Sequence, residues 1–360
     1  MPTVYEQWVK AVGIPFYKGY SHDDLRTLEL GRWEERQCNA AVIELAGQEG
    51  VSETRVIEIP PGKTLPPYRF PVDEVAYVLE GQGLTSVQRS GDPAWKTFEW
   101  QKHSLFVLPR HCYRRLGNAQ GNRPARLLFT SALPLLMQAT LDPDFFVQNS
   151  YVPAPSNESL EGLYSEARIV SNADGWRSEW HGNFFPDMRA WDKLDPFKGR
   201  GAGGKVVWIR FPNSAISAHM SVFPARTYKK AHRHGPGIVI VIPAGEGYSI
   251  MWEEGKEKVF VPWHEASVFV PPNRWFHQHF NLGNAPARYL ALHPARVAQQ
   301  QNTERVGNPS TDQIEYPNED PWIRQKFEEE LGKRGLTSAM PEEAYKVKGF
   351  EWKYAESKED

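Results

Sequence analysis

Four histidines form two closely spaced pairs in the second half of the sequence. His232 and His234 lie in AHRHGPGIVIV, and His277 and His279 lie in RWFHQHFN. Residues i and i+2 of a strand point to the same face, so each pair presents two imidazoles to one side. Neutral imidazole is a ligand for Fe, Ni, Cu and Zn. The spacing therefore predicts one metal ion held between two strands.

The residues around these pairs complete two longer patterns. Gly245 follows the first pair, and Pro272, His277 and Asn281 stand in the order Pro-x-x-x-x-His-x-x-x-Asn. Together the two patterns resemble the two motifs of the cupin superfamily. The resemblance implies an all-β fold built from jelly-roll barrels, and because the chain carries the pattern twice, it resembles a bicupin.

By this resemblance His232, His234 and His277 are the ligands of one divalent metal ion per chain. Two positions depart from the cupin pattern. Ile238 stands where the first motif has a glutamate, and Arg274 stands where the second motif has a glycine. The carboxylate ligand is therefore missing, and three neutral histidines leave the ion with its full 2+ charge. Such a site favours an anionic, chelating substrate.

Three-histidine iron sites occur in cupin dioxygenases, including the bicupin gentisate and hydroxynaphthoate (salicylate-type) ring-cleaving enzymes. The resemblance implies a mononuclear non-haem Fe(II) dioxygenase acting on a small anionic, aromatic hydroxy acid. Those enzymes carry their metal in the N-terminal barrel, whereas here the intact motifs are C-terminal. A non-oxidative isomerase, lyase or hydrolase using Zn, Ni or Mn stays open, as does a small-molecule binding protein.

Further side chains near the motifs are candidates for the pocket. We expect His279 to face the barrel without bonding the metal and to act on protons, with Arg274 as a second catalytic candidate. Aromatic side chains and a further arginine are expected to bind the substrate: Tyr248, Trp252, Trp275 and Arg226.

The sequence repeats itself over much of its length. Pro60 and Pro224 are 164 residues apart, and Trp100 and Trp263 are 163 residues apart, with further pairs at the same two offsets. Both copies consist of short Val/Ile/Phe/Tyr-rich runs between Gly/Pro turns, which is typical of antiparallel strands. The chain is therefore predicted to hold two copies of one β-rich unit.

The first copy keeps the frame of the motifs and loses the ligands. Tyr68 and Phe70 stand at the two histidine positions of the first motif, Arg114 stands at that of the second, and Glu74 is retained. Phenol, phenyl and guanidinium groups do not replace three imidazoles around a divalent cation. We therefore predict a metal-free first barrel that is kept for packing or for shaping the pocket.

These features divide the chain into five parts. We expect a short helix near the N-terminus and a C-terminal helix capped by Asp320. Between them, GRGAGG is expected to be a flexible connector, and Lys229 and Lys230 are expected to lie on a solvated edge. The arms and tail are expected to support a homodimer or homotetramer. The parts are an N-terminal arm (1–53), a degenerate cupin (54–135), a linker (136–204), a metal-binding cupin (205–296) and a tail with a helix (297–360).

Composition excludes several classes of partner. The 360 residues carry 42 Lys and Arg against 44 Asp and Glu, a formal charge of −2, which offers no basic surface to nucleic acid or an anionic membrane. The N-terminal segment lacks the apolar stretch of a secretory signal, so we expect a cytoplasmic protein. Cys38 and Cys112 match no zinc or redox spacing. The expected partner is a small-molecule substrate.

Overall fold

The computed structural model of the chain describes residues 1–89, 92–147, 151, 160, 162–165, 167–171, 178–190, 194–212, 214–294 and 311–354. Short strands are the commonest regular elements among these residues, and the helices are few. None of the described helices combines the length and the apolar character needed to cross a membrane.

Eight strands of the first half form two facing sheets, in the orders β5-β12-β7-β10 and β6-β11-β8-β9. This order is that of a jelly roll, in which consecutive strands alternate between two sheets. The strands are β5 (Glu53–Ile59), β6 (Tyr68–Arg69), β7 (Glu74–Glu80), β8 (Gln82–Arg89), β9 (Lys96–Gln101), β10 (Leu105–Leu108), β11 (Cys112–Asn118) and β12 (Ala125–Ser131).

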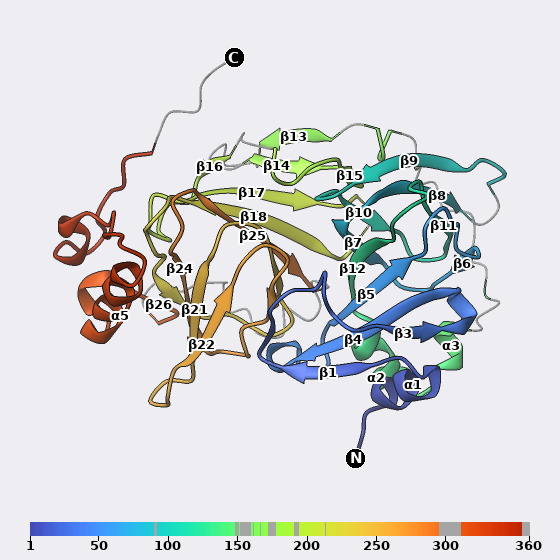
Figure 1. The fold of residues 1–360 in the computed structure, drawn as a ribbon, viewed down its shortest axis with the longest axis horizontal. Helices are drawn as coiled ribbons and strands as arrows, with labels where there is room; N and C mark the ends of the chain where they lie inside the picture. Colours follow the sequence, from blue (N-terminus) through green and yellow to red (C-terminus); the bar gives the residue numbers. More distant parts are fainter. Residues whose placement is uncertain are drawn as a thin grey trace.

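Eight strands of the second half repeat this order, as β18-β25-β20-β23 and β19-β24-β21-β22. The prediction of an all-β chain with two jelly-roll barrels is confirmed, and the two barrels lie at opposite ends of the molecule (Figure 1). The strands are β18 (Ser217–Phe223), β19 (Ala231–His232), β20 (Val239–Ala244), β21 (Gly247–Trp252), β22 (Val259–Trp263), β23 (Val268–Phe269), β24 (Phe276–Asn281) and β25 (Ala287–His293).

The N-terminal arm and the linker are less irregular than expected, because both extend the large sheets. In each half, one added strand runs parallel to the next, β1 to β4 and β14 to β17. The two halves also exchange strands, since β2 pairs with β23 and β15 pairs with β10. The added strands are β1 (Phe16–Gly19), β2 (Ser21–His22), β3 (Gly31–Trp33), β4 (Cys38–Leu45), β13 (Arg168–Ser171), β14 (Ser178–His181), β15 (Phe184–Phe185), β16 (Asp195–Pro196) and β17 (Lys205–Arg210).

The large sheets are apolar on both faces, and this joins the two barrels. Along β7, Ala76 and Val78 belong to the interior of the first barrel, whereas Val75 and Tyr77 belong to a second cluster. That second cluster also contains Val207 and other residues of the second barrel's large sheet. Successive side chains of a strand point to opposite faces, so β7 serves both cores.

Helices cover the ends and one outer face. An N-terminal capping box between Thr3 and Glu6 starts α1, and the Asp320 carboxylate accepts from Trp322 N to start α5. Both predicted helices are confirmed. β26 (Gln313–Ile314) adds the tail to β19. The helices are α1 (Val4–Val12), α2 (Leu133–Thr140), α3 (Asp144–Val147), α5 (Pro321–Gly332) and the 3₁₀ turns η1 (Glu34–Arg36), η2 (Ala46–Gln48), η3 (Tyr316–Asn318) and η4 (Glu342–Tyr345).

Glu319 fastens this tail to the outside of the second barrel. Its carboxyl accepts from the Tyr228 hydroxyl and from Gln278 Nε2 at 3.2 Å. Burial raises its pKa to about 7, and the charge of Asp320 acts in the same direction, whereas the Tyr228 and Gln278 hydrogen bonds and Arg324 lower that pKa. Because the folded pKa exceeds the unfolded one, protonation stabilises the fold, and this contribution is lost as pH rises from about 4.5 through 7.

We expect the free energy of unfolding of the wild type to fall by roughly 2 kcal/mol between pH 5 and pH 8, measured relative to that of the Glu319→Gln variant over the same range. Urea unfolding of both proteins at four pH values in that range measures the difference. Glu328→Gln, on the exposed side of α5, is the control and should follow the wild type. Parallel pH profiles for wild type and Glu319→Gln would refute this role for Glu319.

Candidate metal centre

Three histidine side chains from neighbouring strands meet in the second barrel. His232 at the end of β19 pairs with His277 of β24, and His234 follows two residues later. Ring centroids are 4.2 Å apart for His232 and His277 and 4.6 Å apart for His234 and His277. One nitrogen of each ring lies within 4.8 Å of the others. Within the described ranges, no other group of three His, Cys, Asp or Glu side chains meets this geometry.

Backbone carbonyls orient two of the three rings. Nδ1 of His234 lies 2.7 Å from Gly235 O, and Nδ1 of His277 lies 3.2 Å from Trp275 O. A carbonyl oxygen only accepts, so Nδ1 carries the hydrogen and Nε2 keeps its lone pair. Nε2 of His277 and Nδ1 of His232 are buried without a hydrogen-bond partner. Buried nitrogens without a partner, in rings as close as these, are what a metal ion would satisfy.

The electrostatics of the cluster also suit a metal. Burial lowers the pKa of His232 and His277 well below the usual value and lowers that of His234 to about 4. The imidazoles are therefore neutral near pH 7, which is the form that binds metals. His277 is 1% exposed, while the other two are partly exposed and give solvent a route to the cluster. The residues present therefore fit a divalent ion.

Asp312 brings a carboxylate close to the cluster, but this carboxylate is already paired with two arginines. Asp312 Oδ1 lies 2.6 Å from Arg274 Nη2 and 3.1 Å from Arg233 Nε. Arg233 stands between His232 and His234, so Asp312 neutralises charge beside the cluster rather than joining it. Among the described residues, the cluster that could hold a metal consists of three histidines; that they act as ligands without a carboxylate stays a prediction.

His279 also faces the barrel interior, but it stands outside the cluster. Its ring centroid is 5.6 Å from that of His277, and its Nδ1 is 2.8 Å from Ser249 Oγ. Trp263 Nε1 donates to the same Ser249 oxygen at 3.1 Å, which fixes the hydroxyl. Burial lowers the pKa of His279 to about 3. The structure thus places a neutral, firmly oriented imidazole beside the ligands.

Comparisons with known proteins find only distant structural similarity. No family model matches the chain, and no curated protein matches it. Solved structures that match include a mutant of Bacillus subtilis oxalate decarboxylase, 11% identical over 76% of each chain with a TM-score of 0.49. The Lactobacillus farciminis oxalate decarboxylase formate complex is 14% identical over 77% of this chain and 86% of that one, also at 0.49. These values carry no argument about activity. The fold of two jelly-roll barrels follows from the strand order of the two halves.

Arg274 and Trp275 lie next to the cluster. Arg274 N donates to His234 O at 2.9 Å, while its guanidinium is bound to Asp312. Its φ of 61° lies in the left-handed region that favours glycine, so Arg274 holds a turn conformation that residues with a Cβ rarely adopt. Trp275 packs against Tyr20 with ring centroids 5.9 Å apart. The structure brings both residues to the site, and their roles in catalysis and binding stay predictions.

Tyr248 and Trp252 do not reach the site, which corrects the sequence prediction. Along β21 they alternate with Ser249, the residue that contacts His279, so they point to the opposite face of the sheet. Tyr248 stacks on Phe280 with centroids 4.5 Å apart, and both aromatic residues belong to the cluster that packs under α5. They are core residues between the barrel and the tail.

Arg226 is also placed away from the histidines. It lies in the turn between β18 and β19, where Ala339 N donates to its carbonyl at 2.9 Å. The next residue, Thr227, accepts from Asn281 N at 3.0 Å, at the end of β24 opposite to His277. The predicted contact of Arg226 with substrate at the cluster is therefore not supported.

The glycine-rich segment at 199–204 contributes a charge that the sequence prediction missed. The segment is a set of hydrogen-bonded turns instead of a flexible connector, and Phe197 N donates to Gly204 O at 2.7 Å. Gly201 has φ 73°, and a Cβ there would lie 2.1 Å from the Tyr316 hydroxyl. The loop carries Arg200, whose charge lowers the pKa of all four histidines, after the larger effect of burial.

Lys229 is the second residue that the prediction missed. It was expected on a solvated edge, yet it is 1% exposed inside the barrel. Its Nζ donates to Ser221 Oγ at 2.5 Å and to Tyr289 Oη at 3.2 Å. Burial lowers its pKa well below the usual value. Lys230 is also buried and forms an ion pair with Glu315 at 2.7 Å.

In the first barrel, the position that corresponds to the histidine cluster is filled by charged side chains. The Glu74 carboxylate contacts Arg114 Nη1 at 2.5 Å, the Tyr68 hydroxyl at 3.0 Å, and a guanidinium nitrogen of Arg55. Burial alone would raise the pKa of Glu74, but the charges of Arg55 and Arg114 outweigh it and hold that pKa below its usual value. Guanidinium groups thus stand where the second barrel gathers imidazoles.

Proposed function

We propose that the chain is a metal-dependent oxygenase. Its second barrel would hold one Fe(II) ion on His232, His234 and His277, and its substrate would be a small anionic, aromatic hydroxy acid. The observation that carries the proposal is the cluster of three neutral imidazoles, each with a ring nitrogen within 4.8 Å of the others and with no carboxylate among them; a ring nitrogen of His232 and one of His277 are buried without a hydrogen-bond partner.

The charges around the cluster support an anionic substrate. Arg200, Arg233 and Arg274 lie close to the histidines. Asp312 pairs with Arg233 and Arg274, and Glu254 pairs with Arg233 at 2.9 Å, so three arginines stand against two carboxylates. Three neutral ligands add no negative charge of their own. An incoming carboxylate therefore meets a site whose surroundings carry an excess of positive charge.

When bound, the metal would supply a Lewis acid and, as iron, a route for electrons between substrate and dioxygen. The chain's own residues do the rest. His279 is held by Ser249 in one orientation, so it can take or give a proton at a fixed place beside the ligands. Buried aromatic rings such as Phe269, 5.6 Å from the His279 ring, exclude water from this side.

Elemental analysis tests the proposal first. We expect protein purified anaerobically without added metal to contain about one iron per chain, and His232→Ala protein to contain almost none. Oxygen consumption with a panel of hydroxybenzoates and hydroxynaphthoates should then identify a substrate. Stoichiometric zinc, nickel or manganese would replace the oxygenase by a non-oxidative metal enzyme. Protein without metal would leave the binding-protein hypothesis.

A further inference from the structure

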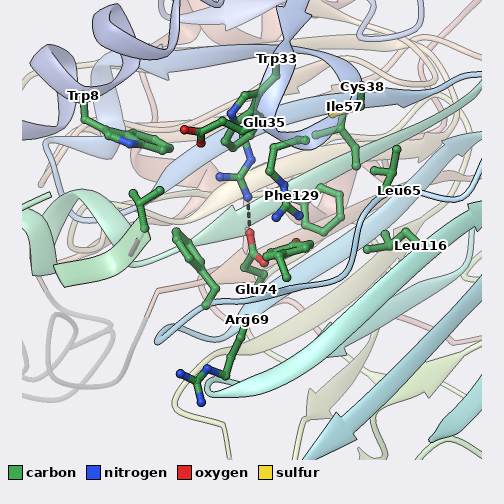
Figure 2. A pocket seen from close by; sticks show the side chains of 15 residues that line it. Trp8, Trp33, Glu35, Cys38, Ile57, Leu65, Arg69, Glu74, Leu116 and Phe129 are labelled. Atoms are coloured by element: carbon green, nitrogen blue, oxygen red, sulfur yellow. Dashed lines mark hydrogen bonds and ion pairs between the residues drawn. The ribbon is translucent and has the colours of Figure 1, made fainter. Parts of the chain in front are cut away.

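The first barrel contains a cavity of about 200 Å³ that the proposed function does not use. Figure 2 shows it, with Trp8 and Trp33 near one another on one side, Leu65 and Leu116 on another, and Glu74 between them. Most of the wall is aromatic or aliphatic. An engineered apolar cavity of roughly 150 Å³ accepts benzene, so this volume accommodates one substituted ring.

Arg36 brings a positive charge without an anionic partner to the wall of this cavity. Arg36 ends the 3₁₀ turn η1, and its guanidinium lies 3.0 Å from the centroid of the Tyr68 ring and 5.8 Å from that of Trp33. In the part of the chain that the structure describes, it has neither a hydrogen bond nor an ion pair. Burial lowers its pKa below the usual value.

The neighbouring charges leave a positive excess at this cavity. Among the side chains that line it, three arginines stand against two glutamates: Arg36, Arg55 and Arg69, and Glu35 and Glu74. Arg114, which shares Glu74 with Arg55, and Glu53, 3.5 Å from Arg55, lie behind the wall and leave this excess of one positive charge unchanged. Nε of Arg55 and Nε of Arg114 are also buried without partners. A partly buried cation without an anionic partner is unfavourable, and a guanidinium binds a carboxylate through two parallel hydrogen bonds.

Glu35 limits the charge of the ligand. Its carboxylate is largely exposed at the edge of the cavity, beside Trp8 in Figure 2, and it makes no ion pair with Arg36. A doubly charged ligand would meet both Glu35 and Glu74. The excess of one positive charge, the aromatic walls and the cavity volume together describe a singly charged acid built on one ring.

We propose that the first barrel binds a small aromatic monocarboxylate, with its ring among Trp8, Trp33 and Phe129 and its carboxylate on Arg36. This site needs no metal and does not depend on the function proposed for the second barrel. The degenerate barrel is then a ligand-binding unit in which the positive charge that holds the ligand belongs to an arginine side chain and not to a metal ion.

Isothermal titration of the full chain with benzoate, in a buffer free of phosphate and acetate, tests the site. Wild-type protein should bind one benzoate per chain, and benzyl alcohol, the neutral analogue, should bind at least tenfold more weakly. Arg36→Gln should weaken benzoate binding at least tenfold. Arg32→Gln, which removes an exposed arginine of the neighbouring β3, should leave it unchanged, and Glu35→Gln should not weaken it.

Two further measurements keep the outcome decisive. His232→Ala protein should bind benzoate as wild type does, because loss of binding there would place the ligand at the metal centre. If Arg36→Gln does not fold, a crystal structure of the wild-type benzoate complex decides between the sites by the position of the carboxylate. Absence of binding to wild type, equal binding of benzyl alcohol, or benzoate located outside the first barrel would overturn the proposal.

Discussion

Replacing His277 by alanine should remove the metal and lower turnover at least a hundredfold. His277 is the member of the cluster with a buried, unpaired Nε2 and a backbone carbonyl that fixes its tautomer. Changes to groups that merely support a ligand already weaken metal binding about 10- to 100-fold, so loss of the ligand itself should exceed that. Metal content per chain and turnover with the identified substrate are the two measurements.

His279→Ala is the matched control, because it removes an imidazole two residues along the same strand. This variant should keep its metal and lose turnover, since His279 bonds Ser249 and stands outside the ligand cluster. The comparison separates a ligand from a proton-transfer group. Metal retained in His277→Ala, or lost in His279→Ala, would show that the ligand set is assigned incorrectly.

The meeting of the three histidines could be predicted because it depends on short-range patterns. His232 and His234 share a face through strand spacing alone, and the repeat shows which segment returns to them with His277. The same reasoning identified Ile238 at the place of the missing carboxylate. A jelly roll brings these two segments together whatever the rest of the chain does, so little tertiary information was needed.

The aromatic residues of β21 show where pattern reasoning fails. Apolar side chains of a barrel strand normally point inward, which would bring Tyr248 and Trp252 toward the metal. Here Phe327 and other residues of α5 cover the outer face and create a second core there. A helix some 70 residues later in the chain thus decides which face of β21 is buried, and the strand's own sequence holds no sign of it.

Arg200 and Lys229 were missed for a related reason. Both owe their environment to segments distant in sequence: Arg200 donates to Gln313 at 3.1 Å, and Lys229 is enclosed by Ser221 and Tyr289. A lysine is rarely buried, so its sequence context favours an exposed edge. The arms behaved likewise, since the pairing of β2 with the far barrel becomes visible only once both large sheets exist.

Glu74→Gln should destabilise the protein by about 3–5 kcal/mol, although it changes volume little. Glu74 is fully buried and shared by Arg55, Arg114 and Tyr68, so the amide leaves two guanidinium groups without their common carboxylate. The free energy of unfolding from urea titration measures the loss. Glu99→Gln, on the exposed side of β9, should change it by no more than about 0.5 kcal/mol.

The double variant Glu74→Gln with Arg114→Met separates the charge from the packing. Removing a whole buried ion pair is less harmful than removing one partner, because no uncompensated charge remains. We therefore expect the double variant to recover at least half of the stability lost in Glu74→Gln, a coupling that a double-mutant cycle measures directly. If the stability losses of the two single variants simply add in the double variant, Glu74 and Arg114 are not coupled, and the guanidinium groups around Glu74 do not form a fixed positive charge in the first barrel. In that case the charge excess that we assign to its cavity would also be in doubt.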